Sequence, residues 1–313
     1  MMVRNEADII EASVRHNLSL LDGLYVAHHR SVDGTGAILA ALRSEGLPLA
    51  VGEETATAFV QWKTLTALTS VAFRDGADFV FALDADEFLR TPSRPRLEAT
   101  LASIPGDMHA VVDIRTYVPL QPLLVNTPVS AAAVRRRVAH ERLRNFHVVV
   151  TRVFTERPQE AIADGNHRMV DLADSTRPQR HARLSPDAVT IAHLPVRSAN
   201  QLAAKAIVNW LSHRAAHRGN PDMAYHWRDM YDDVCAGRPL DALRVAEIAV
   251  NYGLPRDQWL PPDAVAMVDD APLPDAPLRY SHLATLAPLA IVTRFAEDLA
   301  RSTTSVADPA TMP

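Results

Sequence analysis

The sequence predicts an α/β fold, in which helices cover both faces of a mostly parallel β-sheet. Short apolar strands alternate with helical patterns through about residue 104, which is typical of right-handed crossovers in a doubly wound sheet. Residues 79–83 (FVFAL) are apolar at every position, as in a parallel strand that is covered on both faces. Polar segments at 4–6, 28–35 and 84–87 lie at or just after predicted strands. Because ligands of such sheets bind at the carboxyl ends of the strands, we expect a functional site there.

The first half of the chain begins with a predicted helix. Asn5 can cap this helix, and Glu6, Asp8 and Glu11 lie near its positive end, where acidic side chains are favoured. Its apolar face comprises Ile10, Val14, Leu18 and Leu21. The elements that follow are expected at 24–27 (strand), 37–44 (helix), 47–51 (strand), about 55–75 (helix) and 79–83 (central strand).

The second half is less regular. Ser198 and Gln201 fit a capping box, which predicts a helix from Ser198 to about His217. The other elements are expected at 110–118, 148–154 and 189–193 (strands) and around 222–235, 240–251 and 284–301 (helices). We therefore expect a core at 1–196, a helical C-terminal region at 197–302 that packs on it, and a disordered tail at 303–313.

Composition narrows the class of protein. Of the 313 residues, 48% are hydrophobic, enough for a sizeable buried core. The 32 Lys and Arg residues do not outnumber the 37 Asp and Glu residues, so nothing argues for binding to nucleic acid. Apolar runs are too short to span a membrane, the first residues lack a signal-peptide pattern, and Cys235 alone forms no internal disulfide. We expect a cytoplasmic globular protein, with peripheral contact to a membrane surface left open.

Asp84 and Asp86 are the sharpest chemical feature. Carboxylates at i and i+2 of an extended segment point the same way, while Ala85 points away. Such hard oxygen ligands suit Mg²⁺ or Mn²⁺. A metal at the end of a buried strand can also grip a diphosphate and neutralise charge on a departing nucleotide. The alternative is an acidic turn between strand and loop that holds no metal.

Several segments, in order over roughly residues 1–210, resemble glycosyltransferase family 2. They are MVRNEADII (2–10), SVDGT (31–35), FALDADEFL (81–89), GNH (165–167) and HLPVRS (193–198) with Gln201 and Lys205. The resemblance implies the GT-A fold, a nucleotide-diphosphate-sugar donor, a metal-dependent DxD motif and, usually, inversion at the anomeric carbon.

The resemblance also implies roles for individual residues. Asp84 and Asp86 would hold Mn²⁺ or Mg²⁺, and His193, after a late strand, would be a third ligand, or else a structural histidine. The family more often uses an Asp or Glu as general base, but no such residue is clear here; the turn at 165–167 instead presents His167, whose pKa suits a general base that faces the acceptor. The residues that would bind the donor are Arg4, Asn5, Glu6, Asp33, Arg197, Gln201 and Lys205. Arg197, Gln201 and Lys205 share one helix face, where they can bind a diphosphate or form a solvated stripe. The other four residues can instead be helix caps or solvated groups.

Two departures from the family stand out. Its members usually begin with a full apolar strand, whereas here only Met1–Val3 precede Arg4. We expect that Met1–Val3 is the stub of a truncated strand, or that the sheet edge is built differently. The family also tends to have D-N-G-S where this chain has HHRS (28–31), and the missing aspartate helps to hold the base. The base of the donor therefore stays open.

The function that we expect is sugar transfer to a carbohydrate or lipid-linked hydroxyl acceptor, in cell-envelope or exopolysaccharide synthesis. A nucleotidyltransferase would need a glycine-rich phosphate loop, and residues 1–20 contain no glycine. A binding protein that kept the fold and lost catalysis is a second alternative. A phosphatase is disfavoured because Glu87-Phe88, rather than Gly and Thr, follow Asp86. Arg135–Arg137 would meet an anionic acceptor or a membrane surface, or form a solvated face.

Overall fold

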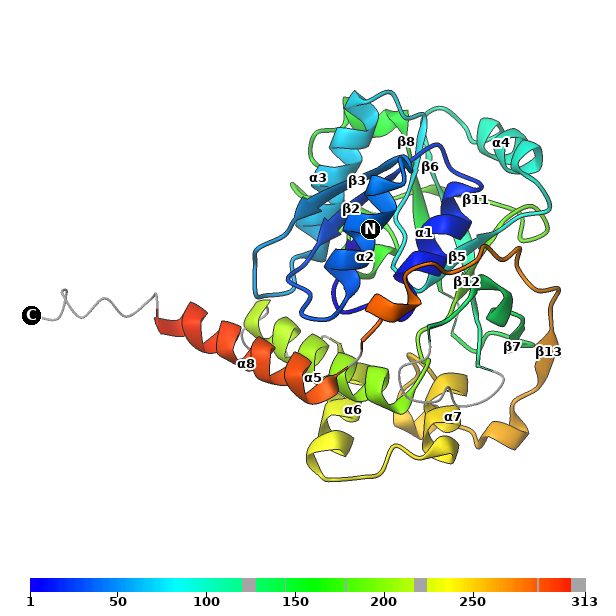
Figure 1. Cartoon of the computed structure of the whole chain (residues 1–313). Helices are drawn as coiled ribbons and strands as arrows, with labels where there is room; N and C mark the ends of the chain where they lie inside the picture. The colour runs from blue at the N-terminus through cyan, green and yellow to red at the C-terminus, as the bar shows by residue number, and fades with distance from the viewer. Residues whose placement is uncertain (120–127, 144, 178, 217–223, 286, 305–313) are drawn as a thin grey trace, which may run out of the picture.

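Two β-sheets form the centre of the molecule (Figure 1). The structure is a computed structural model that describes residues 1–119, 128–143, 145–177, 179–216, 224–285 and 287–304. The smaller sheet is parallel and contains, in spatial order, β1 (Met2–Val3), β2 (Leu24–His28) and β3 (Leu49–Glu53). The larger sheet has the spatial order β4 (Phe79–Phe81), β8 (Phe146–Thr151), β6 (His109–Thr116), β12 (Thr190–His193) and β5 (Glu87–Arg90), with β11 (His181–Arg183) also paired to β6.

Pairing in the larger sheet is mixed. β8 runs antiparallel to both β4 and β6, and β12 runs antiparallel to β5, whereas β11 and β12 run parallel to β6. The predicted α/β class is confirmed, but the prediction of a mostly parallel sheet is wrong for this sheet. The described chain between β6 and β12 contains no α-helix, so the crossover helices that usually join parallel neighbours are missing from this stretch.

Residues 79–83 do not form the central strand that their apolar pattern predicted. β4 ends at Phe81 and lies at one end of the hydrogen-bonded order of its sheet. An apolar cavity of about 680 Å³ borders β4 and is also lined by Leu24, Leu65 and Leu97. The apolar run therefore reflects apolar surroundings, and not strand neighbours on both sides.

Three helices and the two sheets enclose the largest apolar core. α1 (Ile10–Leu18), α2 (Thr35–Ser44) and α4 (Arg94–Ala102) contribute buried side chains to it. Those side chains include Ile10, Val14, Ile38, Leu39, Leu42, Leu97 and Leu101. α3 (Gln61–Arg74) packs instead on β4 and β8 and on the ribbon of β9 (Glu160–Ile162) and β10 (Met169–Asp171).

The remaining helices form the C-terminal region. α5 (Ala199–Ala216) lies beside α8 (Pro288–Thr304), and Val208 meets Phe295 between them (Figure 1). α6 (Tyr225–Cys235) and α7 (Ala242–Val250) pack on α5, while β13 (Met267–Asp269) pairs with β7 (Arg136–Val138). The expected helix end at His217, the start of the helix at 222–235 and residues 305–313 of the expected tail lie outside the described residues.

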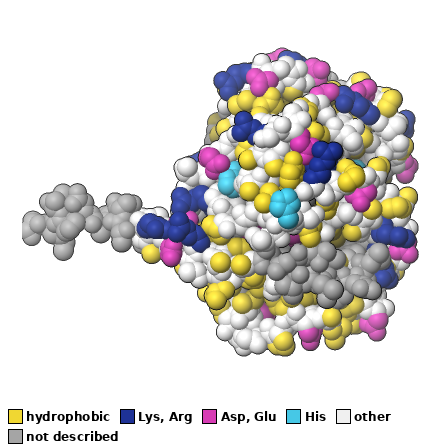
Figure 2. Space-filling model, in the orientation of Figure 1, with side chains coloured by type: hydrophobic (Ala, Val, Ile, Leu, Met, Phe, Trp, Pro, Cys, Tyr) yellow, Lys and Arg dark blue, Asp and Glu magenta, His cyan; other side chains and the backbone are white. Residues whose placement is uncertain are grey.

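Charges of both signs are present on the face of the molecule in Figure 2. On the face in Figure 2, basic and acidic side chains are dispersed among hydrophobic and neutral ones. Within the described ranges, no helix combines the length and the apolar character that a membrane span needs.

The predicted helix caps had different outcomes. The capping box is confirmed in part: Ser198 Oγ accepts from Gln201 N at 3.1 Å, but the Gln201 side chain accepts at 3.2 Å from Arg197 N, one residue before the cap. The cap at Asn5 is wrong. Asn5 adopts a left-handed conformation with φ of 57°, its side chain accepts from Val32 N, and α1 begins only at Ile10. Glu6 and Asp8 are thus free for partners other than the helix end.

Residues 279–284 are fastened to α1 and to the start of α2. The Glu11 carboxylate accepts from the backbone N–H groups of Arg279 at 2.7 Å and Tyr280 at 2.9 Å. The Leu283 carbonyl packs against Gly34 so closely that a Cβ on Gly34 would lie 1.8 Å from the Leu283 oxygen. Only glycine fits there, although its φ of −68° suits any residue.

We expect Gly34→Ala to lower the free energy of unfolding by about 1–3 kcal/mol, because the added methyl group meets backbone atoms that cannot rotate away. The measurement is urea denaturation followed by circular dichroism. Gly52→Ala is the control: nothing lies within 4 Å of its added Cβ, so stability should stay level or rise slightly. Equal stability of the two variants would contradict the packing.

Candidate functional site

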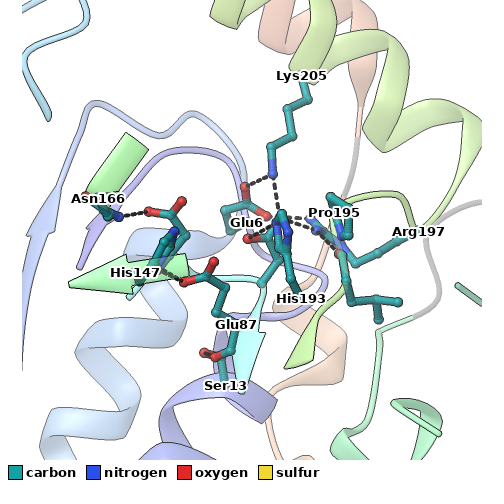
Figure 3. Close-up of polar contacts among 12 residues, drawn as sticks. Glu6, Ser13, Glu87, His147, Asn166, His193, Pro195, Arg197 and Lys205 are labelled. Carbon is teal, nitrogen blue, oxygen red and sulfur yellow. Dashed lines mark hydrogen bonds and ion pairs between the residues drawn. The ribbon is translucent and has the colours of Figure 1, made fainter. Parts of the chain in front are cut away.

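Charged side chains from distant parts of the chain meet beside the strand ends (Figure 3). Glu6 follows β1, Asp86 lies between β4 and β5, and His193 ends β12. Arg197 and Lys205 reach the same place from the start of α5. The structure thus brings together five of the predicted site residues, at the edge where ligands of α/β sheets bind.

Arg197 is the hub of this cluster. Its side chain is completely buried, and its guanidinium donates to Asp8 at 2.7 Å, to Asp86 at 3.3 Å and to Glu6. Burial disfavours the charge, but Asp8, Glu6 and Asp86 together raise the pKa of Arg197 above its ordinary value. The guanidinium therefore stays charged and pins three segments of the chain to one point.

Lys205 lies beside this hub. Its ammonium contacts Asp86 at 2.7 Å and Glu6 at 3.0 Å. Burial disfavours both charges, yet the pKa of Lys205 is raised by Asp86 and Glu6, and that of Asp86 is lowered by Lys205, His193 and Arg197. Asp86 is accordingly a permanent carboxylate that cations of the protein already hold, with His193 Nε2 at 3.6 Å from its other oxygen.

Asp84 and Asp86 have separate partners. The sequence predicted an extended segment with both carboxylates on one side, but residues 85–86 form a turn, and Glu87 N donates to Asp84 O at 3.3 Å. Asp84 Oδ1 accepts from Gln61 at 3.1 Å and from Asn166 at 3.2 Å, away from the bonds of Asp86 to Lys205 and Arg197.

Asp84, Glu87 and His147 form the group that suits a metal ion. Each offers a ligand atom, and these atoms lie within 4.8 Å of one another. Glu87 Oε2 accepts from Asp84 N at 2.8 Å and pairs at 3.1 Å with His147 Nδ1, which also bonds the Ala82 carbonyl at 3.0 Å. The buried Glu87 Oε1 has no hydrogen-bond partner among the described residues. A buried carboxylate oxygen without a partner is costly, and a cation would satisfy it. Two carboxylates and an imidazole fit Mn²⁺, and Mg²⁺ with water ligands added.

Burial sets the protonation of this group. It raises the pKa of Asp84 to about 7, with the charge of Glu87 as the next cause. Burial opposes the charge of His147, but Glu87 raises the pKa of His147 above its ordinary value. Between pH 3.8 and about 7 the folded protein therefore binds a proton at Asp84 that the unfolded chain does not, so this group's contribution to stability is lost as pH rises through 7.

The 165–167 segment supports the group from the side. Gly165 has φ of 79°, a left-handed conformation that favours glycine, and a Cβ there would lie 2.9 Å from the His167 ring. Both the backbone conformation and the packing therefore favour glycine. Asn166 donates to Asp84. His167 Nδ1 bonds the Phe146 carbonyl at 2.9 Å, and burial and the neighbouring His147 lower the pKa of His167. His167 is thus neutral near pH 7, with Nε2 as the basic nitrogen.

Four of the residues predicted to bind a donor are engaged within the protein. Arg4 donates to the His29 carbonyl at 2.8 Å and lies 5.3 Å from the Phe295 ring centroid. Asn5 shapes the turn described above. Asp33 accepts from Thr35 and from Ala7 N, as a local cap would. Both ends of the Gln201 amide bond the backbone.

Four residues of the site were not among the predicted site residues. Asp8 and Glu87 lie within the motifs at 2–10 and 81–89, so the motifs could have indicated that these residues belong to the site. His147 lies in a strand without a motif, and only its place beside β4 reveals it. Tyr252 comes from beyond α7, and its ring lies 5.6 Å from that of His193. Burial raises the pKa of Tyr252, so its hydroxyl remains a donor.

No known protein-family model matches the chain, and no curated protein sequence matches it. The chemistry of the site is therefore inferred from its own side chains.

We expect Arg197→Gln to lower the free energy of unfolding by about 3–5 kcal/mol, because Glu6 and Asp8 would be left buried without their cation. The control is Arg152→Gln. Arg152 is exposed and pairs with Asp78 at 3.0 Å, so its loss should cost about 0–1 kcal/mol. Equal losses in urea denaturation would show that the buried cluster is not the stronger constraint.

We expect Glu87→Gln to weaken Mn²⁺ binding at least about tenfold at pH 8, and Asp86→Asn to weaken it less. Calorimetric titration of the protein with Mn²⁺ measures this, with the exposed Glu98→Gln as control. In the wild type, affinity should be full above pH 7 and fall below it, because a proton then competes for Asp84. The reverse order of the two variants would favour Asp84, Asp86 and His193 as the ligands.

Proposed function

We propose that the protein is a metal-dependent, inverting glycosyltransferase with the GT-A fold. It transfers a sugar from a nucleotide-diphosphate donor to a hydroxyl of a carbohydrate or lipid-linked acceptor, in cell-envelope or exopolysaccharide synthesis. The observation that supports it most is the group Asp84, Glu87 and His147 beside Lys205 and Arg197. Carboxylates that suit a divalent cation and basic groups that suit a diphosphate occur together there.

The net negative charge of the site favours binding of a cation first and of a diphosphate only after it. Among the described residues, five carboxylates face two permanent cations, Arg197 and Lys205; the carboxylates are those of Glu6, Asp8, Asp84, Asp86 and Glu87. A free diphosphate would meet net negative charge in a poorly solvated place. A bound Mn²⁺ or Mg²⁺ would reduce that negative charge and stabilise the charge on the departing nucleotide diphosphate.

Side chains of the protein would position the reactants. Asn166 and Gln61 hold Asp84 in place, and Glu87 orients the His147 ring. The ammonium of Lys205 lies at the rim of the cluster, from which it can donate to a phosphate oxygen. His167, with Nδ1 bound to the Phe146 carbonyl, has Nε2 to accept the proton of the acceptor hydroxyl.

One observation favours the alternative of a binding protein that lost catalysis. Arg4, Asn5 and Asp33, which the resemblance assigns to the donor, already bond groups of the protein. Such a protein would bind a metal and a nucleotide without turning over a sugar.

The test is a donor-hydrolysis screen of the purified protein over UDP-, GDP- and dTDP-sugars with Mn²⁺ or Mg²⁺. We expect one donor class to be hydrolysed only with metal, and Asp84→Asn to reduce turnover by about two orders of magnitude, as for loss of one strong electrostatic stabiliser. Glu98→Gln should be unaffected. Metal-dependent nucleotide binding without turnover would support the binding protein instead, and absence of both would exclude both functions.

A further inference from the structure

Tyr252 reaches the site from a turn that is fastened on both sides of it. Asn251, before it, is completely buried, and its Nδ2 donates to the Leu260 carbonyl at 2.8 Å while its Oδ1 accepts from Leu260 N at 2.9 Å. After it, the Gly253 carbonyl accepts from the Tyr225 hydroxyl. The backbone of Tyr252 is therefore held in one place.

Neighbouring rings also fix the direction of the Tyr252 side chain. The ring centroids of His193, His226 and Trp227 lie 5.6, 5.8 and 6.0 Å from that of Tyr252. The interplanar angles are 82°, 68° and 74°, so the contacts are of the edge-to-face kind that aromatic pairs prefer. His193 Nε2 lies 3.6 Å from Asp86 Oδ1, so one residue joins the Tyr252 ring to the buried ion cluster.

The Tyr252 hydroxyl faces the charged groups of the site and bonds none of them. Besides burial, the groups that act on its pKa are Lys205, which lowers it, and Asp86, Asp84 and Glu6, which raise it. The pKa of Tyr252 is raised overall, so the hydroxyl keeps its proton. Among the described residues this hydroxyl has no hydrogen-bond partner, although the residue is half-buried. A donor that is fixed but unused, and poorly solvated, is costly unless a ligand satisfies it.

Lys205 offers a second unused donor near this hydroxyl. An ammonium has three N–H groups. Within the described chain, Asp86 at 2.7 Å and Glu6 at 3.0 Å account for two of them. The charge of Lys205 is also the one that acts most strongly on Tyr252, so the two side chains point to a common place. A neutral donor and the remaining N–H of an ammonium thus occur together beside the metal-competent group.

We propose that the Tyr252 hydroxyl, together with Lys205, binds the diphosphate of the nucleotide that the protein uses as donor. The inference rests on the proposed function and adds to it a binding residue from the helical C-terminal region. A diphosphate has more terminal oxygens than one metal ion binds, and both donors can bond those that remain. A neutral hydroxyl suits this place because it donates to an anion without adding negative charge beside the carboxylates. As the sugar leaves, charge grows on the diphosphate, so these hydrogen bonds strengthen.

The experiment is calorimetric titration of the wild type and Tyr252→Phe with UDP, GDP and dTDP, each at saturating Mn²⁺. The variant keeps the ring and removes only the hydroxyl. We expect the nucleotide that binds the wild type to bind Tyr252→Phe about tenfold more weakly, as for loss of one hydrogen bond to a charged group. Mn²⁺ alone should bind both proteins equally. Tyr25→Phe is the matched control, because the Tyr25 hydroxyl bonds Asp75 at 2.6 Å, away from the carboxyl end of β2.

Thermal unfolding separates a binding role of the hydroxyl from a structural one. Without nucleotide, the melting temperature of Tyr252→Phe should match or exceed that of the wild type, because the variant loses a hydroxyl that has no partner in the described chain. With nucleotide and Mn²⁺ added, the variant should gain less stability than the wild type, by linkage. A structural hydroxyl would instead lower the melting temperature without nucleotide and leave nucleotide affinity unchanged.

The possible failures distinguish this inference from the proposed function. If the wild type binds a nucleotide with Mn²⁺ and Tyr252→Phe binds it equally well, the inference is overturned and the transferase function stands. Weaker binding of Mn²⁺ alone by Tyr252→Phe would place the hydroxyl at the metal group, and an equal loss of affinity in Tyr25→Phe would make the effect unspecific; either result overturns the inference. If the wild type binds none of the three nucleotides, the donor site is absent, and the proposed function falls together with the inference.

Discussion

The buried guanidinium of Arg197 is the interaction on which the site depends. It joins the chain after β1, through Glu6 and Asp8, to the turn after β4, through Asp86, and to the start of α5. Burying such an ion cluster adds little net stability compared with an apolar core, but removing one partner is costly. Its main effect is therefore on specificity, because only one arrangement of these segments satisfies all four charges.

This constraint divides the acidic residues between two tasks. Asp86 is held by Arg197 and Lys205 and keeps its charge because of them. Asp84 and Glu87 face His147 instead, where Glu87 Oε1 has no hydrogen-bond partner in the described part of the chain and the pKa of Asp84 is raised. The turn at 85–86 produces the division, since it directs adjacent carboxylates to different neighbours. A single DxD motif thus contributes to a structural ion cluster and to a metal-competent group.

The sequence predicted what depends on local pattern and missed what depends on distant partners. Periodicity located the main helices and strands, and the predicted cap at Ser198 accepts from Gln201 N, because these features require only neighbouring residues. The same local reasoning assigned Glu6 and Asp8 to a helix end, since nothing near them in sequence reveals a buried arginine 191 and 189 positions away. The position of β4 at one end of its sheet and the place of His147 in the site likewise depend on which strands pair, and these strands are far apart in the sequence.

The C-terminal region belongs to the site and is more than a cover over it. Arg197 and Lys205 supply its permanent cations, and Tyr252 places its ring against His193. Without these cations the carboxylates at the strand ends would repel one another in a buried place, where such repulsion is strong. The strand ends therefore provide the carboxylates, and the helical region provides the positive charge that lets those carboxylates stay together. Chemistry at this edge of the sheet requires both parts of the chain to be folded against each other.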